Sequence, residues 1–80
     1  VEARIAHILL EFSEKYGSEL NGAIHFKIPI TREEMANYAG ITRETMSRKL
    51  KNLEAEGILS FQSPRLITIE DEDSLRSLLS

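Results

Sequence analysis

Apolar and polar positions follow different periods along the chain, and each period predicts an element. From Val1 to Tyr16 apolar residues recur at helical spacing, and Gly17 follows where such a helix would end. Serine, asparagine and glycine between Gly17 and Ala23 predict a loop. Alternating apolar and polar residues from Ile24 to Ile28 predict a short strand, and Pro29 limits its pairing as a central strand. The apolar stripe of the first helix comprises Ile5, Ile8, Leu9, Phe12 and Tyr16.

Two more helices are predicted in the middle of the chain. The first begins at Thr31, which has a glutamate three positions later in the pattern of a capping box, and ends at Gly40. The second begins at Thr42, a favourable residue type for a helix start, and runs from Arg43 to about Glu56. A turn of about three residues separates the two helices, which is the spacing of a helix-turn-helix.

The remaining residues predict a hairpin and a short helix. Ile58 to Phe61 and Leu66 to Ile69 are apolar runs joined by the tight turn Gln62 to Arg65. Asp71 to Leu79 has leucines at helical spacing and acids in its first turn, where the helix dipole favours them. The predicted fold class is α+β, mainly helical: a winged helix-turn-helix with a short β-hairpin wing and a long N-terminal helix.

Length and composition limit the classes of function. The 80 residues have room for one core, so we expect a single domain over residues 1–80. The absence of cysteine excludes disulfides and thiolate metal sites, and no apolar run reaches the roughly 20 residues that span a membrane. His7 and His25 lack the spacing of metal ligands, and no nucleophile has a recognisable base. We therefore expect neither a metal site nor an enzyme.

Charge is unevenly distributed. Ten basic and 13 acidic residues give a net charge of -3, which taken alone argues against nucleic acid as a partner. Four of the acids stand together at Glu70 to Asp73, whereas Arg43 to Lys51 holds four basic residues and one acid, or +3. The chain therefore has one acidic and one basic segment in a nearly neutral body.

The basic segment falls on the predicted helix Arg43 to Glu56. At helical periodicity Met46, Leu50 and Leu53 share an arc of roughly 60° that suits core packing. Arginine, glutamate and serine on the other side can hydrogen-bond base edges in the major groove of DNA. A solvated face stabilised by ion pairs is the alternative interpretation. The outward arc comprises Arg43, Glu44, Ser47, Arg48 and Lys51.

The segment from Ile30 to Leu50 resembles the DNA-binding domain of the Crp–Fnr transcription regulators. Its Glu-x-x-Ser-Arg run matches the Fnr branch, and the arginine before that run matches the Crp branch. Lys49 is a departure, because the family usually has an apolar residue there; we expect Leu50 to supply the packing. The resemblance implies base contacts by Arg43, Glu44, Ser47 and Arg48. It implies phosphate contacts by Thr31, Thr42, Thr45, Lys51 and Arg65.

The same resemblance carries expectations about the whole protein. An effector-sensing β-barrel and a dimerisation helix would precede Val1, and a homodimer would bind an inverted repeat of TGTGA- or TTGAT-like half-sites in double-stranded DNA. The regulator would be bacterial and cytoplasmic, with RNA polymerase as a further candidate partner. Gly17 to Ala23 lies where family members can touch the polymerase, but its residues match no pattern of the family. We expect no cofactor within these residues; the effector is not predicted. The alternative is a winged-helix protein-interaction module without DNA binding, which the acidic tail would fit.

Overall fold

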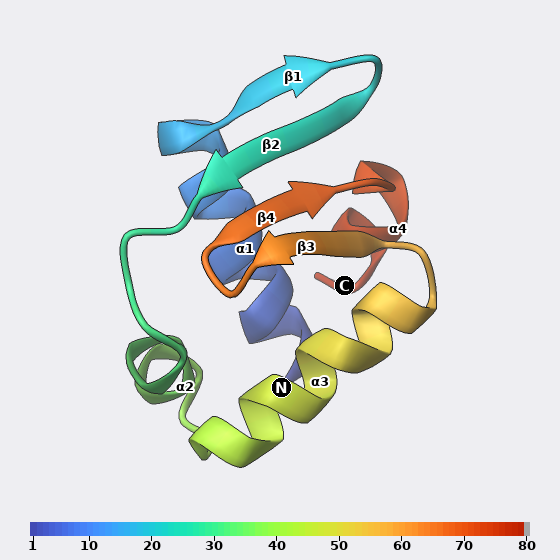
Figure 1. Ribbon diagram of the computed structural model, residues 1–80. Helices are drawn as coiled ribbons and strands as arrows, with labels where there is room; N and C mark the ends of the chain where they lie inside the picture. The colour runs from blue at the N-terminus through green and yellow to red at the C-terminus, as the bar shows by residue number, and fades with distance from the viewer. Residues whose placement is uncertain (80) are drawn as a thin grey trace.

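The computed structural model describes residues 1–79, which form four helices and four strands (Figure 1). The elements in chain order are α1 (Glu2–Tyr16), β1 (Ser18–Leu20), β2 (Ala23–Lys27), α2 (Arg32–Ala39), α3 (Arg43–Ala55), β3 (Leu59–Ser63), β4 (Leu66–Ile69) and α4 (Glu72–Ser77). This order confirms the predicted α+β winged helix-turn-helix, with a long N-terminal helix and β3–β4 as the wing.

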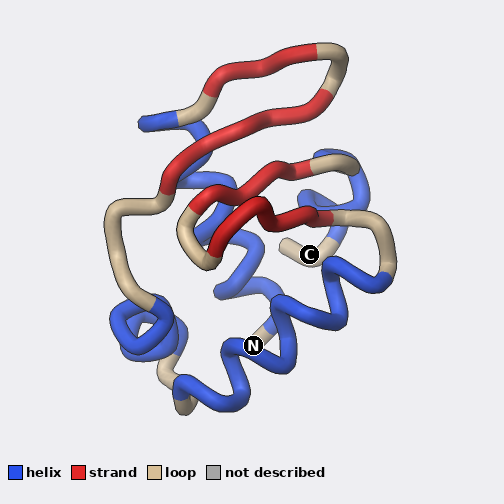
Figure 2. The backbone as a smooth tube through the Cα atoms, in the orientation of Figure 1, coloured by secondary structure: helices blue, strands red, loops and turns tan. Residues whose placement is uncertain are grey.

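The strands form one antiparallel sheet in the order β1-β2-β4-β3. Phe26 of β2 and Phe61 of β3 both pair with Ile67 of β4, so β4 joins the N-terminal hairpin to the wing. The register shifts between Phe61 and Ser63, near the tip of the wing. Figure 2 shows the strands side by side at one end of the molecule, with α2 and α3 at the other end. The wing tip nevertheless approaches the helix pair, because Pro64 lines the same hollows as Arg32 of α2 and Arg43 of α3.

The core lies between the helices and the sheet. Leu9 of α1, Met35 of α2 and Ile67 of β4 are at most 1% exposed and belong to one apolar cluster. Full burial of such a side chain contributes about 1.5–3 kcal/mol of transfer free energy. The large side chains with less than 2% exposure are Ile5, Leu9, Ile28, Met35, Met46, Leu50, Leu59, Ile67, Ile69 and Leu75.

The predicted loop from Gly17 to Ala23 is wrong, because part of it is strand β1. β1 pairs with β2, and Asn21 and Gly22 form the turn with φ of 55° and 83°. Two consecutive residues with positive φ match the twist of a hairpin, and Asn-Gly is a strong signal for such a turn. The Asn-Gly pair therefore predicts this hairpin, whereas the polar composition of the whole segment favours a loop.

The predicted stripe of α1 also needs a correction at its end. Tyr16 is 55% exposed and Phe12 is half-buried, and their rings stack with centroids 6.1 Å apart. Tyr16 is the last residue of α1, where the chain turns sharply into β1. A Cβ atom at Gly17 would lie 2.2 Å from the Ser13 carbonyl oxygen, so this turn requires glycine. Within residues 1–79, no helix is long and apolar enough to cross a membrane.

Candidate nucleic-acid interface

The turn between α2 and α3 is fixed by local hydrogen bonds. Thr31 and Glu34 form the predicted capping box, with distances of 3.1 Å to the Thr31 hydroxyl and 2.9 Å to the Glu34 carboxylate. Gly40 ends α2 in the left-handed region at φ 72°, where glycine carries no penalty from a Cβ atom. The Thr42 hydroxyl then accepts from the Thr45 amide at 3.1 Å and begins α3. Two well-capped helices thus hold the start of α3 in one orientation.

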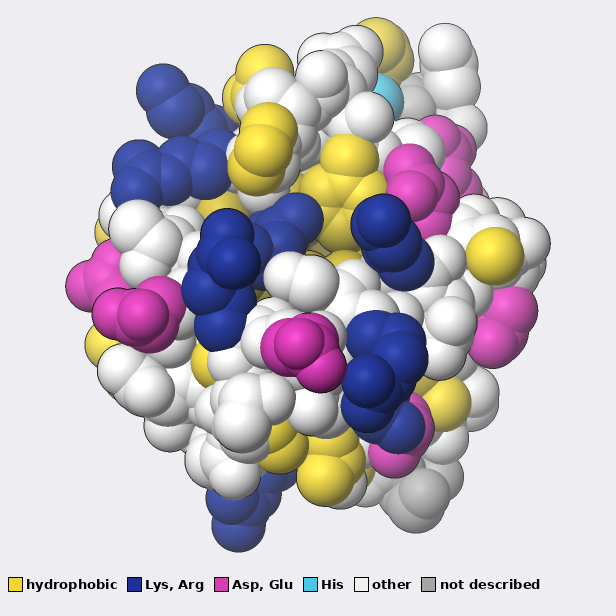
Figure 3. Space-filling model, turned by 60° about the horizontal axis from the view of Figure 1, so that its bottom comes forward, with side chains coloured by type: hydrophobic (Ala, Val, Ile, Leu, Met, Phe, Trp, Pro, Cys, Tyr) yellow, Lys and Arg dark blue, Asp and Glu magenta, His cyan; other side chains and the backbone are white. Residues whose placement is uncertain are grey.

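α3 has the two faces that its sequence predicts. Met46 and Leu50 are at most 1% exposed and Leu53 is 7% exposed, so the inner face is anchored in the core. The outward face of α3, as we call the opposite side, is exposed except for a half-buried Ser47. Figure 3 shows Lys and Arg side chains gathered over this side of the molecule, with a carboxylate among them. The outward face comprises Arg43, Glu44, Ser47, Arg48 and Lys51.

The charges on the outward face lack partners inside the domain. Among residues 1–79, the side chains of Arg43, Arg48 and Lys51 make no hydrogen bond or ion pair. The Glu44 side chain likewise has no partner in this part of the chain, although Arg43 precedes it and Arg48 follows one helical turn later. The alternative interpretation of this face, a surface stabilised by its own ion pairs, therefore finds no support. Unpaired donors on a rigid helix are available to an external anion or to base edges.

The wing lies beside α3 and encloses a hollow with it. The Ser63 hydroxyl accepts from the Leu66 amide at 3.2 Å and closes the turn, while the Arg65 carbonyl accepts from the Ile28 amide at 2.9 Å. The hollow has a volume of about 390 Å³, and we call it the wing groove. Its lining comprises Arg32, Arg43, Ser47, Leu50, Lys51, Glu54, Phe61, Gln62, Ser63 and Pro64.

Arg32 is an interface residue that sequence reasoning missed. It is half-buried in the first turn of α2, and its guanidinium carbon lies 5.1 Å from the centroid of the Phe61 ring. Its Nη1 is 3.7 Å from the sulfur of Met35. Burial, and secondarily the charge of Arg43, lower the pKa of Arg32. No local pattern could reveal this contact, because only the tertiary fold brings β3 to the start of α2.

The residues predicted to contact phosphates fall at two places. Thr31 and Arg65 line a second hollow together with Arg32 and Arg43, between the wing tip and the start of α2. Thr42 and Thr45 lie together at the start of α3, where the Thr42 hydroxyl donates to that of Thr45 at 2.9 Å. Both places border the outward face of α3. Lys51 is on that face and also lines the wing groove.

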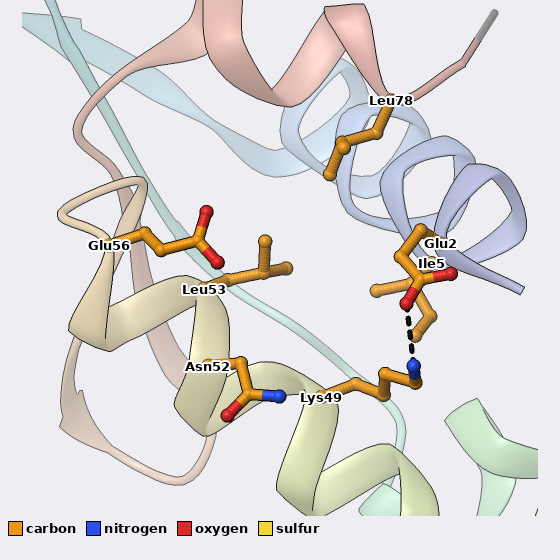
Figure 4. A pocket seen from close by; sticks show the side chains of 7 residues that line it. All are labelled: Glu2, Ile5, Lys49, Asn52, Leu53, Glu56 and Leu78. Carbon is orange, nitrogen blue, oxygen red and sulfur yellow. Dashed lines mark hydrogen bonds and ion pairs between the residues drawn. The ribbon is translucent and has the colours of Figure 1, made fainter.

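Lys49, the departure from the family pattern, points away from this interface. Its ammonium group forms a 2.5 Å ion pair with Glu2 of α1, at the edge of a small pocket of about 110 Å³ (Figure 4). The hydrogen bond from Lys49 holds the pKa of Glu2 below its ordinary value. Leu50 is 1% exposed, so the neighbouring leucine supplies the packing as expected.

The acidic segment, Glu70–Asp73, is largely engaged in contacts within the domain. Glu70 accepts from the Ser60 hydroxyl at 2.7 Å, and Glu72 accepts from Arg76 Nε at 2.7 Å. Asp71 caps α4 by accepting from the Ser74 amide and hydroxyl. In the part of the chain that the structure describes, no group of three or more His, Asp or Glu side chains could hold a metal ion.

Comparisons with known proteins match this architecture over nearly the whole chain. A family model of the Crp-like helix-turn-helix domain matches residues 3–78. The transcriptional activator protein FnrL of Cereibacter sphaeroides is 42% identical over 53 residues, covering 66% of this chain and 21% of FnrL. The anaerobic regulatory protein of Pasteurella multocida is 39% identical over 77 residues, covering 96% of this chain and 28% of that protein.

A solved structure agrees in fold as well as in sequence. FixK2 from Bradyrhizobium japonicum is 32% identical with a TM-score of 0.86, over 99% of this chain and 38% of that one. The chain thus spans 21% to 38% of the length of these three proteins. The matched residues contain the helix pair, the turn and the wing. As the sequence predicts, the chain belongs to the family of Crp-like helix-turn-helix domains.

Proposed function

We propose that this domain binds double-stranded DNA sequence-specifically by placing the N-terminal half of α3 in the major groove. The observation that carries the proposal is the outward face of α3, whose charged groups find no partner within residues 1–79. Helix-turn-helix proteins present the start of this helix to base edges. The wing and the start of α2 border the same face, so they would reach the flanking backbone.

The base contacts would come from four residues of the outward face. Arg43 and Arg48 are exposed and suited to donate two hydrogen bonds each to guanine O6 and N7. Glu44 would accept from cytosine N4, and Ser47 would donate or accept. A half-site of the TGTGA or TTGAT type is consistent with these chemistries, and its outer bases would depend on Arg43.

The phosphate contacts would surround this reading face. Thr42 and Thr45 at the start of α3, with Thr31 and Arg65 beside the wing, border it on different sides. The Thr45 hydroxyl hydrogen is free to donate, whereas the Thr42 hydroxyl donates to that of Thr45 and would have to turn from it to reach a phosphate. Lys51 would add a cation one turn beyond Ser47. Such contacts fix the position of the protein on the duplex without reading sequence.

The whole protein would add functions that these residues do not contain. The relatives are longer, so an N-terminal effector-sensing domain and a dimerisation helix are part of the proposal. A homodimer would bind an inverted repeat with half-sites about one helical turn apart. A bacterial regulator of this kind would work in the cytoplasm, contact RNA polymerase and catalyse no reaction. Residues 1–80 would then form its single DNA-binding domain.

A competition experiment tests the proposal. The chain, joined to a dimerising coiled coil, is titrated at low salt into a labelled inverted repeat of each half-site and into a random duplex. We expect tighter binding to one repeat, and a steep loss of affinity with added salt. Lys15→Ala is the charge control for the variants of the outward face, because it also removes one positive charge. Lys15 is exposed at the end of α1, away from α3, so this variant should keep the preference of the wild type. Equal affinity for all duplexes would contradict the proposal and favour a protein-interaction module.

A further inference from the structure

Arg32 and Phe61 connect the helix pair to the wing. Arg32 belongs to the first turn of α2, and Phe61 belongs to β3 of the wing. The guanidinium carbon lies 5.1 Å from the ring centroid, which is within the range of a cation–π contact. Phe61 is itself half-buried and packs against the core, so its ring is a fixed platform.

The charge of Arg32 is held without a carboxylate. Within residues 1–79 the guanidinium donates only to the Met35 sulfur and contacts the Phe61 ring, and it forms no ion pair. Burial and the neighbouring Arg43 both disfavour its charged form. Glu33 and Glu54 line the adjacent hollows but do not reach it. Because this partly buried guanidinium has no ion pair within the described residues, it is available to bind an anion from another molecule.

The position of Arg32 specifies where that anion would lie. Arg32 and Arg43 line both hollows, the wing groove and the one shared with Thr31 and Arg65. These hollows lie between the wing and the helix pair, so a DNA strand leaving the major groove toward the wing would bring a phosphate here. The guanidinium presents several donors in one plane, which suits phosphate oxygens.

We propose that Phe61 is a positioning residue whose ring holds the Arg32 guanidinium in the wing groove, ready to pair with a backbone phosphate. The ring thereby links the wing to the start of α2, so that the two contact the DNA as one unit. This inference rests on the proposed DNA binding and adds a residue that does not itself touch DNA.

Salt-dependent titration of variants tests the inference. Arg32→Ala should weaken binding to the half-site repeat and to random duplex alike, by about 3- to 10-fold. It should also make the negative slope of log affinity against log salt shallower by about one. Phe61→Leu should reproduce much of both effects although Arg32 is still present, because leucine offers no ring face. Phe61→Tyr should restore them. In the double variant Arg32→Ala/Phe61→Leu the two losses of affinity should not add, since each substitution removes the same phosphate contact.

The controls separate positioning from stability and from the proposed function. Phe12→Leu removes another half-buried ring, on α1, and should lower the melting temperature without changing the salt slope. All titrations are made well below the melting temperature of each variant. An unchanged slope in Phe61→Leu, or no restoration by Phe61→Tyr, would overturn the inference while wild-type binding stands. A wild type without sequence preference would instead refute the proposed function.

A second measurement does not depend on the folding of variants. In ¹⁵N-labelled wild type the Arg32 Nε–H proton should carry a ring-current shift from Phe61, given the 5.1 Å contact. Addition of either duplex should change that signal, because the phosphate contact is independent of sequence. Free and bound spectra with an identical Arg32 signal would overturn the inference.

Discussion

The acidic segment Glu70–Asp73 and the outward face of α3 carry opposite charges and use them in opposite ways. In the acidic segment Glu70, Asp71 and Glu72 each find a donor within the domain. On the outward face, Arg43 and Arg48 find none among residues 1–79. The acids therefore support the fold, whereas the cations are left for a partner. The net charge of -3 describes neither region.

The difference also explains how a chain with a net charge of -3 could bind DNA as proposed. Electrostatic attraction to DNA depends on the charges near the contact, because at about 0.15 M salt the interaction is screened beyond about 8 Å. The acidic segment runs from the end of β4 into the first turn of α4. The outward face of α3 belongs to the side of the molecule formed by α2 and α3 (Figures 1 and 3). Local charge is the relevant quantity for the interface.

The largest effect is expected from the core beneath the outward face. Leu50→Ala should reduce the free energy of unfolding by about 2–5 kcal/mol, because Leu50 is 1% exposed and its loss leaves a cavity under α3. Urea denaturation followed by circular dichroism measures this change. Leu66→Ala is the control, since Leu66 is 40% exposed, and it should cost far less. Similar losses in both variants would show that α3 is not anchored as described.

Removal of one unpaired cation should affect recognition more than stability. Arg48→Ala should cost about 1–3 kcal/mol of discrimination between the half-site repeat and random duplex, through the lost bidentate contact to guanine. Competition titration measures the ratio of the two affinities. Arg76→Ala removes an arginine that pairs with Glu72 at 2.7 Å, and it should leave that ratio unchanged. Equal loss on both duplexes from Arg48→Ala would assign Arg48 to the phosphates instead.

A smaller effect is expected at the cap of α3. Thr42→Ala should destabilise the domain by about 1 kcal/mol, because the Thr45 amide loses its acceptor at 3.1 Å. If Thr42 also contacts phosphate, affinity for both duplexes should fall equally. Thermal melting and titration of Thr42→Ala and Thr42→Asp separate the two effects, since aspartate keeps an oxygen for the cap but repels a phosphate. A loss confined to the half-site repeat would contradict the phosphate role.

Local sequence signals account for most of the fold and for part of the interface. The caps at Thr31 and Thr42 and the turn between the two apolar runs of the wing act through near neighbours, so both helix starts and the wing were predictable. The hairpin at Asn21-Gly22 also had a local signal, but polar composition favoured a loop. The Arg32–Phe61 and Lys49–Glu2 contacts lacked any such signal, because each joins elements that only the tertiary fold brings together.

The smallest effect concerns the acidic segment and depends on pH. Hydrogen bonds from the Ser74 hydroxyl and, secondarily, its amide hold the pKa of Asp71 below its ordinary value. A carboxyl group whose folded pKa is lowered stabilises the fold above its unfolded pKa, and this contribution fades as pH falls through the folded pKa. Asp71→Asn keeps an oxygen that can cap α4 but removes the charge. Its melting temperature should therefore lie below that of wild type at pH 7, and the gap should close below about pH 4.

Melting curves of Asp71→Asn and of Asp73→Asn over this pH range provide the comparison. Asp73 lies in the same first turn and has no hydrogen-bond partner among residues 1–79, so it shares the helix dipole but not the cap. Its gap to wild type at pH 7 should be smaller than that of Asp71→Asn. Equal differences in melting temperature from wild type would mean that both acids stabilise α4 only through the helix dipole. The hydrogen bonds of Asp71 would then add nothing beyond what any negative charge near a helix start provides.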